Sequence, residues 1–265
     1  PSVPSVLSVV RINMQIVAVQ QDIVWENKQA NCDRAAAMLR EAKVEPGSLI
    51  VLAEMFATGF SINLPATTEG KDRPTEKFVQ GLAKELDSTI IAGVVNDASP
   101  GKGFNEAVVF SPQGEIARYR KMRPFTLGKE YDAHDAGDEA ISFKWRDAVV
   151  SPFVCYDLRF PEVIRGAARL GAEIICVIAS WPEARFMHWI RLLQARAIEN
   201  QCYVVGVNRG GKDPYRGYKG RSIIVDHNGD IVADAGEGEA VIRADVDLDS
   251  LREYRAKMPF LADMR

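Results

Sequence analysis

Short runs of apolar residues, each about the length of one β-strand, recur along the chain between more polar segments. The runs at 49–53 and 174–179 are apolar at successive positions. Such continuous runs are typical of strands that are covered on both faces. The pattern predicts strands at 14–20, 48–53, 89–95, 105–110, 115–119, 149–154, 173–179, 203–208, 222–226, 230–233 and 239–246.

Helical segments lie between several of these strands. In 27–43 and in 183–200 the apolar side chains fall on one helical face. Pro74 and Pro161 stand where two further helices are expected to begin, because proline is favoured in the first helical turn. A turn signal at 111–114 predicts that the strands on either side form a hairpin. Helices and strands that alternate, mixed with hairpins, predict an α/β fold with a mixed sheet and more than one layer.

Composition limits the kind of protein. The chain has 265 residues, of which 47% are hydrophobic and 26% charged, as in ordinary globular proteins. No linker-like stretch divides it, so we expect a single domain over 14–265, preceded by an N-terminal arm at 1–13. The formal net charge is −3 without a lysine and arginine cluster, which argues against nucleic acid as a partner. No apolar run approaches the ~18 residues of a membrane span, so we expect no membrane partner.

The cysteine pattern narrows the chemistry further. Cys32, Cys155, Cys176 and Cys202 are too few for a disulfide framework in a chain of this length. None of them has metal-ligand spacing to another cysteine or to a histidine, so we expect no metal and no cofactor. The arm lacks the basic start of a signal peptide. Together these features favour a reducing compartment, and we expect the protein in the cytoplasm.

Three polar residues follow three of the apolar strands, namely Glu54, Lys121 and Cys155. Strand ends are where open α/β sheets build their sites. A cysteine attacks as a thiolate, which requires a base and a positive neighbour to lower a thiol pKa near ~8.5. A carboxylate takes the thiol proton and later delivers it to a leaving amine. A lysine stabilises the oxyanion of a tetrahedral intermediate.

Each of these residues also has an ordinary structural explanation. Glu54 would cap a following turn, Lys121 would be a solvated charge, and Cys155 would be a small core residue. The surroundings of Cys155 favour the chemical role, because a strand ends there and a helix begins shortly afterwards. That arrangement exposes a thiol near backbone amides that favour negative charge. Spacing alone leaves both explanations open.

Three separated segments resemble, in the right order, the signature segments of the nitrilase superfamily of carbon–nitrogen hydrolases. The resemblance runs from Met14 to about Val246 and includes 180–185, 188–189 and 194–200. The three segments are Leu52-Ala53-Glu54-Met55-Phe56-Ala57-Thr58-Gly59-Phe60, Tyr119-Arg120-Lys121 and Cys155-Tyr156-Asp157-Leu158-Arg159-Phe160-Pro161-Glu162.

The resemblance implies a role for each signature residue. Cys155 would be the nucleophile, Glu54 the general base and then acid, and Lys121 the oxyanion partner, with the Tyr156 amide as a second donor. A further family glutamate maps onto Glu130, which would orient the lysine and the reacting groups. A solvated loop carboxylate is the alternative for Glu130.

The resemblance also implies an architecture. The family fold is a four-layer α-β-β-α sandwich with two mixed sheets, usually paired into a homodimer. The tail from about 247 would then take part in dimer packing. Its apolar residues at 254–261 have no obvious helical or strand period, so a subunit boundary explains them best.

Residues after the nucleophile separate the branches of the superfamily. True nitrilases usually follow the cysteine with Trp-Glu, whereas this chain has Tyr156 and Asp157. Together with Trp181, which we expect at the substrate, the pattern is most similar to the omega-amidase branch. Those enzymes hydrolyse the terminal amide of short dicarboxylic monoamides and release ammonia.

Three alternatives remain open from the sequence: a general aliphatic amidase, a nitrile hydrolase of the same fold, and a non-catalytic member that binds a partner protein. The recognition of a carboxylate at the far end of the substrate is open as well. Arg159, Arg185 and Arg209 are candidates for it, but each would equally serve in an internal ion pair.

Overall fold

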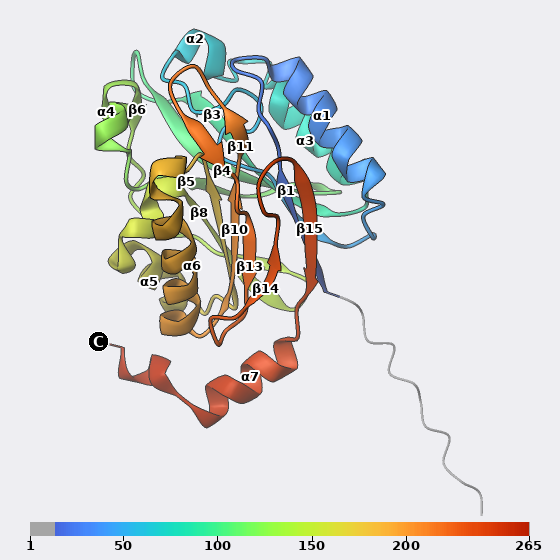
Figure 1. Cartoon of the computed structure of the whole chain (residues 1–265), viewed down its shortest axis with the longest axis vertical. Coiled ribbons are helices and arrows are strands. Elements are labelled where there is room, and N and C mark those ends of the chain that lie inside the picture. The colour runs from blue at the N-terminus through green and yellow to red at the C-terminus, as the bar shows by residue number, and fades with distance from the viewer. Residues whose placement is uncertain (1–13, 265) are drawn as a thin grey trace, which may run out of the picture.

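A computed structural model describes residues 14–264, and the predicted arm at 1–13 lies outside the described residues. Two mixed sheets and a short hairpin account for the strands (Figure 1). The first sheet contains β1 (Gln15–Gln20), β2 (Leu49–Val51), β3 (Thr89–Asp97), β4 (Gly103–Ser111), β5 (Gly114–Arg120), β6 (His134–Asp135) and β15 (Ala240–Asp245). The second sheet contains β7 (Phe143–Trp145), β8 (Ala148–Val154), β9 (Ile174–Ala179), β10 (Tyr203–Asn208), β13 (Ile223–Val225) and β14 (Ile231–Asp234). The separate hairpin consists of β11 (Gly210–Lys212) and β12 (Gly217–Lys219).

Each sheet has a parallel centre flanked by antiparallel strands, apart from the short β6, which pairs with β4 in parallel. The first sheet has the order β15-β1-β2-β3-β4-β5 with β6 beside β4, and β1, β2 and β3 are parallel. The second has the order β14-β13-β10-β9-β8-β7, with β8, β9 and β10 parallel. Because β4 is antiparallel to both β3 and β5, the strand β5 runs in the same direction as β2 and β3. The carboxyl ends of β2, β3 and β5 therefore meet at one edge of the first sheet.

The helices cover the outer faces of the sheets. Figure 1 shows α1 (Lys28–Glu41) and α3 (Pro74–Glu85) on one side of the strands, and α5 (Pro161–Arg169) and α6 (Phe186–Asn200) on the other. The helices α1 and α3 contact strands of the first sheet, and α6 contacts strands of the second. Strands β1 and β4 contact β10 and β8 of the facing sheet, so the two sheets pack directly on each other. The order is helix, sheet, sheet, helix, as the resemblance implied.

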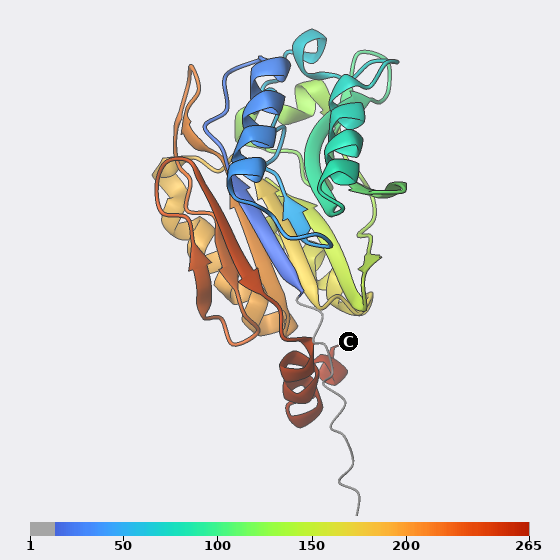
Figure 2. The ribbon, with the colours of Figure 1, turned by 90° about the vertical axis from the view of Figure 1, so that its right-hand side faces the viewer.

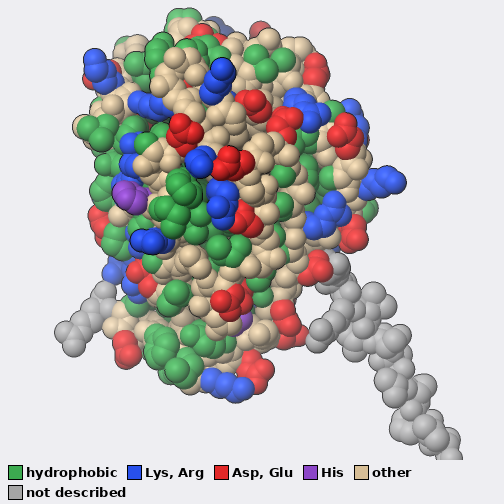
Figure 3. Space-filling model, in the orientation of Figure 1, with side chains coloured by type: hydrophobic (Ala, Val, Ile, Leu, Met, Phe, Trp, Pro, Cys, Tyr) green, Lys and Arg blue, Asp and Glu red, His purple; other side chains and the backbone are tan. Residues whose placement is uncertain are grey.

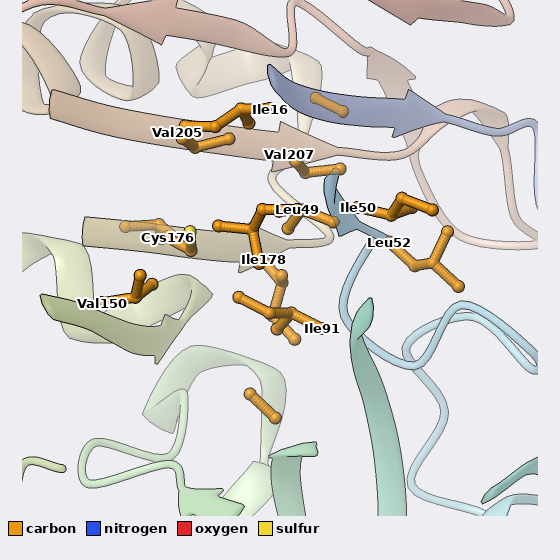
Figure 4. Close-up of a cluster of buried hydrophobic side chains, with 14 of the residues drawn as sticks. Ile16, Leu49, Ile50, Leu52, Ile91, Val150, Cys176, Ile178, Val205 and Val207 are labelled. Atoms are coloured by element: carbon orange, nitrogen blue, oxygen red, sulfur yellow. The ribbon is translucent and has the colours of Figure 1, made fainter. Parts of the chain in front are cut away.

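The core lies between the two sheets. Figure 4 shows Ile16, Leu49 and Ile91 of the first sheet facing Ile178 and Val205 of the second. All of these side chains are fully buried. Burial of a side chain of this size contributes roughly 1.5–3 kcal/mol. The strongly apolar strands that the sequence predicted are thus the strands that hold the two sheets together.

The remaining elements are short, apart from the C-terminal helix. They are α2 (Leu64–Thr67), α4 (Glu130–Ala133), α7 (Leu248–Lys257) and four 3₁₀ turns at Thr126–Gly128, Cys155–Arg159, Glu183–Arg185 and Phe260–Asp263. The helix α7 lies below the sheets in Figures 1 and 2, with Leu248 and Leu251 buried beneath them. Within residues 14–264, no helix is long and apolar enough to cross a bilayer.

Several predicted boundaries need correction. The helix expected over 183–200 begins with a 3₁₀ turn, and α6 starts only at Phe186. The apolar residues at 254–261 were expected to lack a helical period, yet α7 includes 254–257. Asp247 caps the first turn of this helix by accepting from the Ser250 amide. The predicted hairpin is confirmed as β4 and β5. The hairpin of β11 and β12 was not predicted, since its residues are mostly glycine and polar.

Candidate active site

The structure brings Glu54, Lys121 and Glu130 together in one buried cluster. The ammonium Nζ of Lys121 lies 2.8 Å from Glu54 Oε1 and 2.8 Å from Glu130 Oε2. All three side chains are at most 1% exposed. The solvated-charge explanation for Lys121 and the solvated-loop explanation for Glu130 are therefore wrong. Glu130 lies at the start of α4 and also accepts a hydrogen bond from the Phe125 amide at 2.5 Å.

Cys155 is next to this cluster, on the turn that follows β8. The other oxygen of Glu54, Oε2, accepts from the Ser180 amide at 2.8 Å, and Ser180 and Cys155 line the same cavity. Cys155 has a φ of +48° and Met55, directly after Glu54, has a φ of +46°. Backbone in this left-handed region is costly for residues other than glycine and is concentrated at functional sites. The two side chains that were predicted to react, Glu54 and Cys155, thus lie on sharp turns at strand ends.

A glycine of β3 makes room for the Glu54 turn. A Cβ added to Gly93 would lie 2.4 Å from the Met55 amide nitrogen and 2.6 Å from the Glu54 Cα. Both contacts are with backbone, which cannot move aside as a flexible side chain would. The absence of a side chain at position 93 therefore allows Glu54 to approach the neighbouring strand and reach Lys121.

The cluster determines the charges of its members. Burial alone would lower the pKa of Lys121, but Glu130 and Glu54 outweigh it and hold that pKa well above its ordinary value. Burial would raise the pKa of Glu130, but the Lys121 ammonium and the Asn105 amide bring it below the usual range. The lysine is thus a cation held between two carboxyl groups.

The pKa of Cys155, the predicted nucleophile, is shifted in the direction opposite to the sequence-based expectation. Burial, followed by the nearby Glu54 carboxylate, raises the pKa of the Cys155 thiol well above its ordinary value, although Lys121 acts in the opposite direction. The positive neighbour does not produce a resting thiolate, because its charge is already balanced by two glutamates. The direction of this pKa shift favours the neutral thiol. Burial also raises the pKa of Cys32 and Cys202, each to about 12, and all four cysteines are unpaired.

The cavity above Cys155 has an aromatic and basic lining. Its volume is about 340 Å³, including open solvent at its mouth. Tyr156 and Trp181, both predicted at the substrate, belong to it, and so does Phe125. The complete lining is Phe60, Phe125, Cys155, Tyr156, Arg159, Ser180, Trp181, Pro182, Arg185 and Arg216.

Three guanidinium groups line this cavity and rest on aromatic faces. Arg159 lies 4.7 Å from the centre of the Trp181 ring, while Arg185 and Arg216 lie 5.7 and 6.0 Å from that of Phe125. Among residues 14–264, none of the three has a carboxylate partner within ion-pair distance. Most of the other arginines in this part of the chain do form an ion pair with a carboxylate. Burial and the nearby Arg185 lower the pKa of Arg159. Uncompensated positive charge in a cavity favours an anionic ligand.

The third arginine named from the sequence is structural. Arg209 is fully buried and donates to the backbone oxygens of Ile23, Gly210 and Lys212. It does not line the cavity. Arg216 is the third arginine of the cavity lining. Sequence reasoning missed it because it lies in the unpredicted hairpin, between β11 and β12.

A second residue that sequence reasoning missed is Asn105, on β4 beside Glu54 and Glu130. A single asparagine near the start of a predicted strand gave no signal of its role. No group of three or more potential ligands that could hold a metal ion occurs within the described part of the chain.

Comparison with known proteins identifies the family. Residues 15–256 match the family model for carbon-nitrogen hydrolases, and the chain belongs to that family. It is 36% identical over 252 residues to the omega-amidase YafV of Yersinia enterocolitica, covering 94% of this chain and 96% of that protein. It is 33% identical over 252 residues to the 2-oxoglutaramate amidase of Bacillus subtilis (strain 168), covering 94% and 97%.

A solved structure agrees with this assignment. XC1258 from Xanthomonas campestris, described as a CN-hydrolase superfamily protein with an arsenic adduct in its active site, has a TM-score of 0.88 at 32% identity. The match covers 96% of this chain and 97% of that one. The predicted superfamily, its two-sheet fold and the predicted class of enzyme, a hydrolase of carbon–nitrogen bonds other than peptide bonds, are confirmed.

Proposed function

We propose that this protein is an omega-amidase, which hydrolyses the terminal amide of short dicarboxylic monoamides through a thioester on Cys155. One observation carries the proposal: the buried cluster of Glu54, Lys121 and Glu130 adjoins a cavity that contains a cysteine and three arginines without a carboxylate partner among the described residues. Two relatives that align over almost the whole chain are named as omega-amidase and 2-oxoglutaramate amidase, which supports amidase activity here.

The first half of the reaction forms the acyl-enzyme. The Cys155 thiol gives its proton to the Glu54 carboxylate as the sulfur attacks the amide carbon, so a C–S bond forms and the carbonyl oxygen becomes negative. Lys121 and the Tyr156 amide stabilise that oxyanion. Glu54 then delivers its proton to the nitrogen, the C–N bond breaks, and ammonia leaves with a thioester on Cys155.

The second half returns the enzyme to its starting state. Water enters, loses a proton to Glu54 and attacks the thioester carbon. The C–S bond breaks, the carboxylic acid leaves, and the proton on Glu54 returns to the sulfur of Cys155. Glu130 stays charged throughout, because its oxygens accept from Lys121, Asn105 and the Phe125 amide. Its role in this scheme is to orient Lys121.

The arginines supply the preference for a carboxylate. In this proposal the substrate is a monoamide of a dicarboxylic acid, and its amide carbon lies at Cys155. Its other end then extends along the cavity that Arg159, Arg185 and Arg216 line. A guanidinium group pairs with a carboxylate through two parallel hydrogen bonds. The aromatic rings beneath the arginines hold them in place without neutralising them.

A comparison of matched substrates tests the proposal. The kcat/KM for ammonia release is measured for succinamate, butanamide and butanenitrile, with the Cys155→Ala variant as the blank. Succinamate is expected to be the best substrate by at least about tenfold, since one charged hydrogen-bonded contact contributes roughly 1.5–3 kcal/mol. Preference for butanamide would make the protein a general aliphatic amidase, and preference for the nitrile would contradict the amidase assignment.

We also propose that one catalytic domain over 14–265 pairs into a homodimer in the cytoplasm, with its tail at the subunit boundary. Met258 and Phe260 are 43% and 52% exposed. Figure 3 shows apolar side chains gathered at the lower end of the molecule, over this C-terminal segment. Sedimentation at micromolar concentration is expected to give twice the chain mass of 29.3 kDa, whereas Phe260→Asp shifts it toward the monomer. A wild-type monomer would contradict the homodimer.

A further inference from the structure

A single amide side chain connects the catalytic cluster. The Nδ2 of Asn105 donates one hydrogen bond to Glu54 Oε1 and another to Glu130 Oε1, each at 2.8 Å. The backbone oxygen of the same residue accepts from the Lys121 amide at 2.9 Å. Asn105 is 1% exposed and lies on β4, between the strands that lead to Glu54 and to Lys121. It therefore contacts all three members of the cluster.

We propose that Asn105 is a positioning residue for the amidase reaction: it holds Glu54 and Glu130 on the same lysine and leaves only one oxygen of Glu54 able to accept the thiol proton. This inference rests on the proposed function and adds a residue to it. Asn105 does not touch the reacting atoms itself, and it acts through Glu54.

The need for such a residue follows from charge. Two carboxylates that share one ammonium repel each other, and the cluster of Glu54, Glu130 and Lys121 carries one net negative charge in a buried place. A neutral amide with two N–H groups binds both carboxylates without adding charge. Hydrogen bonds to ionised carboxylates are roughly twice as strong as those between neutral groups. Asn105 thus fixes the separation of the two glutamates at little electrostatic cost.

The hydrogen bonds also select the proton-accepting atom. Glu54 Oε1 accepts from both Lys121 Nζ and Asn105 Nδ2, which uses both of its lone pairs. Among residues 14–264, Glu54 Oε2 accepts only from the Ser180 amide, so one of its lone pairs has no donor among them. Ser180 lines the cavity together with Cys155. The proton of the Cys155 thiol therefore moves to Oε2.

The carbonyl oxygen of the Asn105 side chain also supports a role beyond packing. The Oδ1 of Asn105 is buried and has no hydrogen-bond partner within the described part of the chain. A buried polar atom left unpaired typically costs about 1–3 kcal/mol. A side chain that served the core alone would be better replaced by an apolar residue of the same shape. The two donated hydrogen bonds to catalytic carboxylates explain why the amide is present.

The chain contains a matched control for this residue. Asn96, on β3, donates from its Nδ2 to Glu76 Oε1 at 2.7 Å and to Glu106 Oε2 at 2.8 Å. It is also buried and also bridges two carboxyl groups, but neither of them belongs to the catalytic cluster. Asn105→Leu and Asn96→Leu thus remove the same kind of bridge in the same sheet.

The experiment makes two measurements on both variants. The first is the rate at which iodoacetamide alkylates Cys155, determined by mass spectrometry of the peptide that contains this residue. The second is kcat and KM for succinamate. Thermal unfolding shows that each variant is folded, and Asn105→Ser replaces Asn105→Leu where the latter does not fold. We expect a loss of at least about tenfold in both the alkylation rate and kcat for the variant at 105, because misplaced catalytic groups are costly. Its KM should stay within about threefold, and Asn96→Leu should keep both rates near wild type.

Equal losses in the two variants, or no loss in either, would overturn the role of Asn105. The alkylation rate requires no substrate, so it separates this inference from the proposed function. If the wild type released no ammonia from any amide, the omega-amidase proposal would fail, while the two alkylation rates would still decide whether Asn105 positions the base of Cys155.

Discussion

The hydroxyl of Tyr119 donates a hydrogen bond to Asp157 Oδ2 at 2.8 Å, far from any solvent. Tyr119 stands two residues before Lys121, and Asp157 stands two residues after Cys155. Asp157 also accepts from the backbone amides of Val154 and Arg123. This hydrogen bond thus joins the end of β5, next to Lys121, to the turn of Cys155 that follows β8, and the two strands belong to different sheets.

This bond predicts a specific defect in Tyr119→Phe. The variant keeps the aromatic packing against Phe153, at 5.2 Å between ring centres, and loses only the hydroxyl. Because one hydrogen bond contributes about 1 kcal/mol, kcat for succinamate should fall about fivefold, with KM unchanged. Tyr203→Phe, which removes a hydroxyl that contacts the Asp247 amide elsewhere, is the control. An equal change in kcat for both variants would argue against a link to the site.

Gly93→Ala should lower activity more than stability. The added methyl group meets the backbone of Glu54 and Met55, so the general base must move away from Lys121. We expect kcat to fall at least about a hundredfold, as for other small displacements of catalytic groups. Gly81→Ala is the control, because nothing lies within 4 Å of its new methyl group and alanine favours its helix. Wild-type kcat in Gly93→Ala would show that the close approach is not required.

The raised pKa of the Cys155 thiol predicts how alkylation depends on pH. The neutral thiol prevails below the shifted pKa, so the rate of reaction with iodoacetamide should rise continuously between pH 6 and about pH 9 without a plateau. Reaction of glutathione under the same conditions provides the reference. A plateau that begins below pH 7 would reveal a resting thiolate and would remove the need for Glu54 as a base during attack.

Replacement of the cavity arginines should affect charged and uncharged substrates differently. Arg185→Gln and Arg216→Gln each remove one positive charge from the lining of the cavity. For succinamate we expect kcat/KM to fall at least about tenfold, whereas for butanamide it should change less than about twofold. Equal losses for both amides would mean that these arginines only maintain the shape of the cavity.

The apolar strands could be predicted from the sequence because each is buried on both faces, as Ile50 and Val177 are. Glu54 and Cys155 follow strands of this kind, whereas Lys121 follows β5, in which Tyr119 alone is buried. All three positions at strand ends could still be predicted. Their mutual contact required the family resemblance, since only the fold brings together residues so distant in sequence. The pKa of the Cys155 thiol is shifted upward, whereas a positive neighbour was expected to lower it. One lysine was counted as a free positive charge, whereas two glutamates share it.

Residues that act through hydrogen bonds could not be predicted in the same way. Asn105 stands in an ordinary strand pattern, and its importance arises only from what lies on either side of it. Arg216 lies in a polar hairpin without apolar periodicity. Arg209, which was an equal candidate for a ligand, turned out to support the backbone. The type and position of a single residue in the sequence do not distinguish a residue that belongs to the site from one that supports the backbone.

The most direct test of the account is to trap the covalent intermediate. Enzyme mixed with succinamate is quenched in acid during turnover, and its mass and the modified peptide are determined by mass spectrometry. We predict an added acyl group on the peptide that contains Cys155, and none in Cys155→Ala or when Glu54→Gln replaces the base. An acyl group on Cys32, Cys176 or Cys202, or turnover of succinamate by Cys155→Ala, would contradict it.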